Sequence, residues 1–249
     1  MKNRPVVLSI AGFDPSAGAG VLADIKTLEA NQVYGLGVCT ALTFQHESQF
    51  DGVSWISLNE IERQLEVLYQ KYTIAVVKIG LVENIATLSG IVDAVLRANP
   101  NSKIIFDPIL KASAGFDFHD SMTLDSLALV LQQVYLITPN IPELNRLVLG
   151  DASSEEKALQ LAASCSVYLK GGHKTTATAE DVLFENGLVS FFDSPRIENG
   201  EKHGSGCVLS SAIAAGLAKG YDLPKACSDA KIYINHFLSS SPTLLGSYF

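Results

Sequence analysis

The sequence lacks several features that would narrow its function directly. Its 249 residues contain no run of about 18 apolar residues, the length that a membrane-spanning helix needs. The N-terminus lacks the apolar core and small-residue cleavage site of a signal peptide. The four cysteines lie far apart without a CxxC pair, which is not a zinc pattern and favours reduced thiols. These absences predict a cytoplasmic protein without a membrane partner.

Two further absences concern the ligand. No cluster of Lys or Arg occurs and the net charge is -8, so nucleic acid is not the expected partner, because phosphate backbones are held by clustered basic residues. No GxxxxGK[ST] motif occurs, which excludes a Walker-type nucleotide site. A small phosphate ligand stays compatible with this composition, since backbone N–H groups can hold it.

The hydrophobic share of 47% predicts a globular protein with a large core. Because no linker, low-complexity tract or repeat interrupts the chain, we expect a single domain over residues 1–249. Strand-like apolar runs occupy residues 6–11, 37–43, 75–80, 103–107, 134–138 and 167–170. Helix-like segments alternate with them at residues 18–30, 60–71, 85–98, 120–132, 153–163, 204–219 and 223–238. The alternation predicts an α/β fold with a mostly parallel sheet covered on both faces.

A β-hairpin is expected at one edge of this sheet. Two short β-like runs, residues 181–184 and 188–193, flank Asn186 and Gly187. Asn-Gly between such runs is the strongest short hairpin signal. In open parallel sheets ligands bind at the carboxyl ends of the strands, so the loops there are the expected site.

The first candidate motif, residues 11–20, leaves the first strand and enters a helix. Gly18, Gly20 and Ala23 match the GxGxxA dinucleotide pattern, which requires an acidic residue about 20 positions later. The second strand ends in Thr43-Phe44-Gln45, which supplies none. The sequence therefore argues against a dehydrogenase, and the glycines alone are also explained by a tight turn with close helix packing.

The second candidate motif is Gly204-Ser205-Gly206-Cys207, at the start of a helix rich in small residues. Several N–H groups would point outward near the positive end of the helix dipole, which predicts an anion hole for a phosphate. We expect the same field to lower the pKa of the Cys207 thiol. The alternative is that Cys207 is a small, inert core residue.

Three polar groups follow other strands. Asn140 and Glu143 are typical of a helix start, and Glu143 is alternatively a ligand of hydrated Mg²⁺ beside nucleotide phosphates. Asp107 either caps a loop or faces the ligand. Lys170 precedes Gly171-Gly172-His173 and can place an ammonium group against phosphate, whereas His173 is assigned no role.

The order of these motifs resembles that of the ribokinase-like superfamily and, more closely, of the hydroxymethylpyrimidine/phosphomethylpyrimidine kinases. Further matching stretches are residues 10–27, 35–45, 77–81, 106–109, 137–144, 169–173 and 203–220. The resemblance implies a three-layer α/β/α sandwich and a homodimer. It also implies that ATP and Mg²⁺ are used to phosphorylate 4-amino-5-hydroxymethyl-2-methylpyrimidine, and then its monophosphate, in thiamin biosynthesis.

The resemblance also implies roles for individual residues. Asp24 and Gln45 would hydrogen-bond the aminopyrimidine, and Cys207 would lie near its hydroxyl. The remaining site positions line the substrate pocket (Gly12, Gly80, Leu81, Ile109), form the anion hole (Gly204, Ser205, Gly206), bind nucleotide (Asn140, Lys170) or hold the metal (Glu143, Asp107).

This chain departs from the family pattern at several positions. Phe13 stands where a small residue is usual, Ala17 replaces a common Gly, and Leu81 replaces a usual Met. In the loop at residues 111–115 the usual Lys-Ser-Gly becomes Ser-Ala-Gly, and Lys111 comes two places earlier.

Two rival functions remain from the sequence. The first is a pyridoxal kinase of the same fold, because pyridoxal also carries a hydroxymethyl group on a flat ring. We favour the pyrimidine because Asp24 and Gln45 suit an aminopyrimidine edge. The second is a regulator that binds nucleotide or pyrimidine without catalysis. Loss of the anion hole would support it, but Gly204, Gly206 and Cys207 are all present.

Overall fold

The computed structural model describes residues 4–111, 117–118, 122–172, 178–198 and 200–249. Its centre is a nine-stranded sheet with the order β3-β2-β1-β4-β5-β6-β7-β8-β9. The six strands from β2 to β7 in that order run parallel, and the outer strands β3, β8 and β9 pair antiparallel. The strands are β1 (Val6–Phe13), β2 (Tyr34–His46), β3 (Gln49–Trp55), β4 (Val76–Ile79), β5 (Lys103–Phe106), β6 (Leu136–Ile137), β7 (Ser166–Leu169), β8 (Asp181–Glu185) and β9 (Leu188–Phe192).

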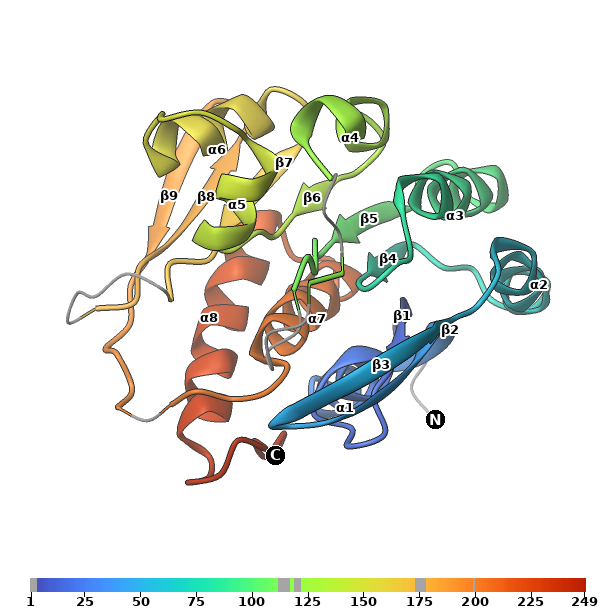
Figure 1. The fold of residues 1–249 in the computed structure, drawn as a ribbon, viewed down its shortest axis with the longest axis horizontal. Helices are drawn as coiled ribbons and strands as arrows, with labels where there is room; N and C mark the ends of the chain where they lie inside the picture. The colour runs from blue at the N-terminus through green and yellow to red at the C-terminus, as the bar shows by residue number, and fades with distance from the viewer. Residues whose placement is uncertain (1–3, 112–116, 119–121, 173–177, 199) are drawn as a thin grey trace.

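Helices cover both faces of the sheet, as Figure 1 shows. On one face lie α2 (Leu58–Tyr69), α3 (Ile85–Ala98), α4 (Leu124–Leu131), α5 (Ile141–Leu147) and α6 (Ser154–Ala162). On the other face lie α1 (Gly20–Ala30), α7 (Ser205–Ala218) and α8 (Leu223–Ser239). The two cores lie between these helices and the sheet, so the architecture is the three-layer α/β/α sandwich that the sequence predicted.

Local signals set the helix starts that the site depends on. The Asn140 side chain accepts a hydrogen bond from the Glu143 amide, and the Glu143 carboxylate accepts one from the Asn140 amide, both at 2.7 Å. This reciprocal capping satisfies two amides that the first helical turn would otherwise leave unpaired. The predicted helix start at residues 141–142 is therefore confirmed.

The edges of the sheet differ in how well the sequence predicted them. The hairpin around Asn186 and Gly187 is confirmed as β8–β9, and Asn186 has a φ of 50°. The second hairpin, β2–β3, was missed, since β2 extends past residue 43 to His46 and pairs with Gln49–Trp55. The helix expected from residue 120 begins at Leu124 within the described residues.

The parallel strands bring their carboxyl ends to one edge of the sheet. The loops after β1, β4, β5, β6 and β7 meet there, opposite the N-terminus of α7 (Figure 1). Within the described ranges, no helix is both long and apolar enough to cross a lipid bilayer.

Candidate active site

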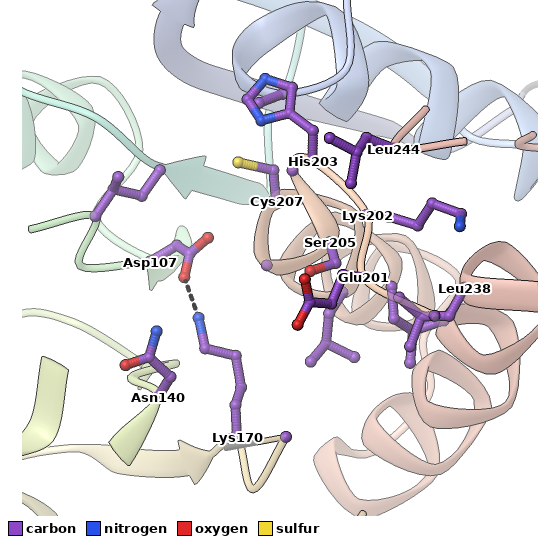
Figure 2. A pocket seen from close by; sticks show the side chains of 18 of the residues that line it. Asp107, Asn140, Lys170, Glu201, Lys202, His203, Ser205, Cys207, Leu238 and Leu244 are labelled. Atoms are coloured by element: carbon purple, nitrogen blue, oxygen red, sulfur yellow. Dashed lines mark hydrogen bonds and ion pairs between the residues drawn. The ribbon is translucent and has the colours of Figure 1, made fainter. Parts of the chain in front are cut away.

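A cavity of about 1200 Å³ opens at the carboxyl edge of the sheet. Most predicted site residues line it: Gly12, Gln45, Leu81, Asp107, Ile109, Asn140, Glu143, Lys170, Gly204, Ser205, Gly206 and Cys207. Figure 2 shows that Asp107, Asn140 and Lys170 reach it from the sheet side, while Ser205 and Cys207 face it from the start of α7. The cavity thus brings together motifs that are far apart in the sequence.

The N-terminus of α7 depends on a glycine in a conformation that other residues disfavour. Gly204 is the N-cap residue, with φ 74° in the left-handed region. A Cβ added there would lie 2.0 Å from the Gly18 carbonyl oxygen. Gly204 therefore allows the α7 turn to pack directly on the β1–α1 loop.

Two amides of this turn are available to a ligand. The Ser205 amide donates to the Lys202 carbonyl at 3.3 Å, and the Val208 amide donates to the Gly204 carbonyl at 3.0 Å. Among the described residues, the amides of Gly206 and Cys207 have no acceptor. Unpaired N–H groups at a helix N-terminus, near its positive dipole end, suit an anion.

Lys170 connects two acidic residues across the cavity wall. Its ammonium nitrogen lies 3.0 Å from Asp107 Oδ1 and 3.5 Å from Glu143 Oε2. A Cβ on Gly206 would lie 3.4 Å from the same nitrogen, so the ammonium group also borders the α7 turn. Burial opposes its charge, but Asp107 and Glu143 raise the pKa of Lys170, which keeps a positive charge beside the unpaired amides.

Asp107 is held by more than this lysine. Its carboxylate also lies 3.0 Å from the Thr138 hydroxyl and 3.1 Å from the Ser210 hydroxyl. Burial would raise the pKa of Asp107, but the charges of Lys170 and Lys78 lower it below its ordinary value. Asp107 therefore stays ionised and already has protein donors on both oxygens, which leaves little room for a direct metal bond.

Glu143 differs from Asp107. Burial, followed by the neighbouring charge of Asp107, raises the pKa of Glu143 despite the attraction of Lys170. One of its oxygens caps α5 through the Asn140 amide, and the residue lines the cavity. Both interpretations of Glu143 thus remain compatible, because a helix cap can also face a ligand. No group of three or more potential metal ligands occurs among the described residues.

Cys207 lies in the first turn of α7, and its thiol is almost fully buried. The expected lowering of its pKa is wrong. Burial, together with the charges of Asp24 and Asp107, raises the pKa of Cys207 to about 11, although Lys78 acts in the opposite direction. Desolvation therefore outweighs the helix dipole, and the resting thiol is protonated near neutral pH.

Gln45 lies at the end of β2 on the opposite wall. Its amide nitrogen donates to the Thr43 hydroxyl at 2.8 Å, which orients the carboxamide. Gly12, Leu81 and Ile109 line the cavity beside it. This wall is mostly apolar with one oriented amide, which suits a flat heteroaromatic ring.

Asp24 and Gly80 do not line the cavity. Asp24 is fully buried beneath it, and its carboxylate accepts hydrogen bonds from Lys78, Ser9 and Ser211. The expected contact between Asp24 and the substrate does not fit this placement, because its oxygens already have protein donors. Its position is that of a support beneath the site.

Sequence reasoning missed two buried polar pairs near the cavity. Lys78 is paired with Asp24 at 2.9 Å, and both side chains are wholly inaccessible to solvent. His203 Nε2 lies 2.8 Å from Asp14, which connects the β1–α1 loop to the turn before α7. A lysine inside the apolar strand Val76–Ile79 was the available signal, because a buried charge requires a partner.

Lys202 and Lys111 are further lysines that line the cavity. Lys202 lines the cavity, and its buried ammonium has no hydrogen-bond partner among the described residues. Lys111 also lines the cavity, and its backbone forms an isolated antiparallel β-bridge with that of Asp117. The rest of the altered loop, residues 112–115, and His173 lie outside the described residues.

Comparison with known proteins decides the family. The phosphomethylpyrimidine kinase family model matches residues 14–248. The chain belongs to this family. A hydroxymethylpyrimidine/phosphomethylpyrimidine kinase of Rhizobium meliloti is 33% identical over 251 residues, covering 96% of this chain and 92% of the relative.

Solved structures of similar proteins agree with the kinase fold. The phosphomethylpyrimidine kinase of Clostridium difficile has a TM-score of 0.78 at 29% identity and covers 94% of this chain and 99% of that one. An ADP complex of Bacillus subtilis pyridoxal kinase has a TM-score of 0.82 at 26% identity, covering 96% and 94%. The phosphomethylpyrimidine kinase family and the ribokinase-like fold expected from the motifs are therefore confirmed.

Proposed function

We propose that this chain transfers phosphate from ATP to 4-amino-5-hydroxymethyl-2-methylpyrimidine and then to its monophosphate, as a kinase of thiamin biosynthesis. The observation that carries the proposal is the α7 turn, whose unpaired Gly206 and Cys207 amides belong to the same cavity wall as the Lys170 ammonium, which lies 3.4 Å from an added Cβ on Gly206. Phosphoryl transfer requires positioning and neutralisation of charge more than covalent chemistry, and this arrangement provides both.

In this mechanism the pyrimidine lies against Gln45 and the apolar wall, with its hydroxymethyl group directed at the γ-phosphate. The α7 amides and Lys170 stabilise negative charge on the transferring group. Cys207 is near enough to orient the hydroxyl or to accept its proton. In the second transfer the acceptor is an ionised phosphate, so no base is required.

We assign the nucleotide to Asn140 and Lys170 and the metal to Glu143. Asn140 and Lys170 border the part of the cavity where polyphosphate would lie. Glu143 fits a hydrated Mg²⁺ better than Asp107 does, because the Asp107 oxygens are already hydrogen-bonded within the protein. Glu143 would hold bound Mg²⁺, which would neutralise negative charge on the phosphates.

Product analysis tests the proposal. Incubation with ATP, Mg²⁺ and the pyrimidine alcohol should give the monophosphate and then the diphosphate by mass spectrometry. Cys207→Ala should slow the first transfer much more than the second. Equal losses in both transfers would show that Cys207 acts through the shape of the turn, and binding of the pyrimidine without turnover would support a regulator instead.

Pyridoxal phosphorylation is the second candidate, favoured by the likeness to the Bacillus subtilis pyridoxal kinase. The same hydroxymethyl geometry serves both rings, so the choice depends on the wall around Gln45. Initial rates with the two alcohols, measured side by side at saturating ATP, should favour the pyrimidine. A higher kcat/KM with pyridoxal would reverse the assignment.

We also propose a cytoplasmic homodimer built from a single domain. The four cysteines are free thiols, which supports a reducing compartment. Leu42 and Phe44 of β2 and Phe13 at the end of β1 expose apolar side chains, which supports contact with a second copy. Sedimentation of the purified protein would decide the dimer.

A further inference from the structure

The Lys78–Asp24 pair lies directly beneath the proposed site, in a place that no solvent reaches. Lys78 belongs to β4 and Asp24 to α1, and both side chains have zero exposure. The ammonium nitrogen lies 3.0 Å from Asp24 Oδ1 and 2.9 Å from Asp24 Oδ2. The position of the lysine charge is therefore fixed by two short contacts.

Two hydroxyls anchor this pair to neighbouring elements. Ser9 of β1 donates to Asp24 at 2.5 Å, and Ser211 of α7 donates to it at 2.8 Å. Ser211 lies one helical turn after Cys207, so both side chains lie on the same face of α7. A Cβ on Gly80 would lie 3.0 Å from the lysine nitrogen, and the next residue, Leu81, lines the cavity.

Stability alone does not account for this pair. The unfavourable free energy of moving two charges out of water is about as large as the favourable free energy of their attraction. Apolar side chains of similar volume often stabilise a core as well or better. An isolated charge at this depth would be strongly unfavourable, so the pair is tolerated because it is complete. Its hydrogen bond to Ser211, one turn after Cys207 on α7, connects the pair to the helix that carries the thiol and points to an electrostatic role.

The titratable groups around Cys207 come from several elements: Lys78 of β4, Asp24 of α1, Asp107 after β5, Lys170 after β7 and the neutral Tyr248 phenol of the C-terminal segment. The Gly20 amide also donates to the sulfur. Burial and the acidic residues raise the pKa of Cys207, and Lys78 is the foremost group that opposes them.

We propose that Lys78 is a positioning residue that stabilises negative charge on the Cys207 sulfur during the first phosphoryl transfer. Cys207 first loses its thiol proton to solvent, and in the transfer step the resulting thiolate takes the hydroxymethyl proton as the oxygen bonds to the γ-phosphorus. The bond from phosphorus to the bridging oxygen breaks, and its electron pair leaves with ADP. Lys78 touches neither substrate and acts only through the sulfur. The inference rests on the proposed kinase function.

The direct test measures the thiol itself without substrates. Alkylation of Cys207 by iodoacetamide, followed by mass spectrometry of its peptide, reports the thiolate fraction across a range of pH. Lys78→Met should slow alkylation at least about tenfold, since one unit of pKa changes the thiolate fraction tenfold. Asp24→Asn removes a negative charge that raises the pKa of Cys207, while Asp107 and the Cys207 thiolate still favour the charged form of Lys78, so it should accelerate alkylation by a similar factor.

Opposite effects of these two substitutions distinguish charge from structure. A merely structural role would loosen the site in both variants and change both rates in the same direction. Cys165, before β7, provides an internal reference because its alkylation reports general opening of the protein. Asp24→Asn keeps the shape of the side chain, so its result stands even if Lys78→Met fails to fold. An unchanged or slower rate in Asp24→Asn overturns the proposal.

Activity gives the second readout. Lys78→Met should reduce kcat of the first transfer at least about tenfold, leave the second nearly unchanged, and recover part of the loss at higher pH. Lys157→Met is the matched control, because Lys157 is also a buried lysine but lies on α6 and bonds only Asn145 among the described residues. The alkylation assay needs no turnover. A failure of the proposed effect of Lys78 on the Cys207 thiol can therefore be distinguished from a failure of the kinase assignment.

Discussion

Lys78 and Lys170 are two buried lysines that pair with aspartates at the same end of the sheet, yet their surroundings differ. The Lys78 side chain has zero exposure and contacts Asp24 beneath the cavity. The Lys170 side chain keeps 13% exposure, contacts Asp107, and borders the cavity itself. In both lysines neighbouring acids raise the pKa against the effect of burial.

The difference shows how one chemistry serves two roles. A charged side chain that a ligand can reach stabilises the ligand by direct contact, because the attraction forms when the ligand binds. A charge sealed beneath the surface acts only on the groups that share its low-dielectric surroundings. We therefore expect Lys170 to influence nucleotide binding and transfer together, and Lys78 to influence only the step that passes through Cys207.

The largest expected effect is that of Lys170→Met. This variant loses a charged donor to the transferring phosphate, and Asp107 and Glu143 lose their shared partner. Its kcat should therefore fall by about 10²–10³-fold. KM for ATP should rise in this variant and stay unchanged in Lys78→Met. Steady-state kinetics of both transfers would measure this. Equal KM values in the two variants would contradict the distinction between them.

The α7 turn borders Lys170 and carries Cys207, so its distortion should damage both roles. Gly204→Ala places a methyl group 2.0 Å from the Gly18 carbonyl and forces a disfavoured φ, which should reduce both activity and stability. Gly150→Ala is the matched control, because it has φ 99° with no atom within 4 Å of the added Cβ. That control should lose only about 1–2 kcal/mol of unfolding free energy, measured by urea denaturation, and keep its activity. Equal losses in both variants would refute the close packing.

The two acids that contact Lys170 should give opposite pH dependences of stability. The folded pKa of Asp107 is lowered, so its contribution is present above its ordinary value of 3.8 and is lost as pH falls through the lower folded value. The folded pKa of Glu143 is raised, so stability is lost as pH rises from 4.5 through the higher folded value. Asp107→Asn should reduce the loss of unfolding free energy at acid pH, and Glu143→Gln should reduce the loss above pH 4.5. Urea unfolding at a series of pH values measures both. Slopes of the same sign for the two residues would contradict this.

The smallest effect concerns the loop that packs beside α7. Ala17 has φ 57°, a conformation that glycine adopts without steric cost, at a position where the family commonly has Gly. Ala17→Gly should raise the unfolding free energy by up to about 1 kcal/mol with unchanged kinetics. Gln32→Gly, with φ 61° and a place outside the cavity lining, provides the comparison. A loss of stability in both variants would show that these turns are not strained.

The sequence predicted features that depend on neighbouring residues. The capping pair of Asn140 and Glu143 is encoded within four residues, and the β8–β9 hairpin by Asn186-Gly187, so both were found. The motif order also gathered most of the predicted site residues at one cavity. Residues 85–98 were predicted as a helix with the bounds that α3 has.

Features that depend on distant contacts were not predicted. The partner of Lys78 lies 54 positions away, so no local pattern connects it to Asp24. The pKa of Cys207 depends on burial under other elements, which the helix-start pattern does not reveal. The strand β3 is mostly half-exposed and contains Asp51-Gly52, so it lacks the apolar run by which the other strands were recognised.

A crystal structure with the pyrimidine alcohol and a non-hydrolysable ATP analogue tests the central claim most directly. The γ-phosphate should accept hydrogen bonds from the Gly206 and Cys207 amides, with Lys170 in contact and Lys78 still sealed against Asp24. A γ-phosphate bound away from the α7 turn would contradict the account.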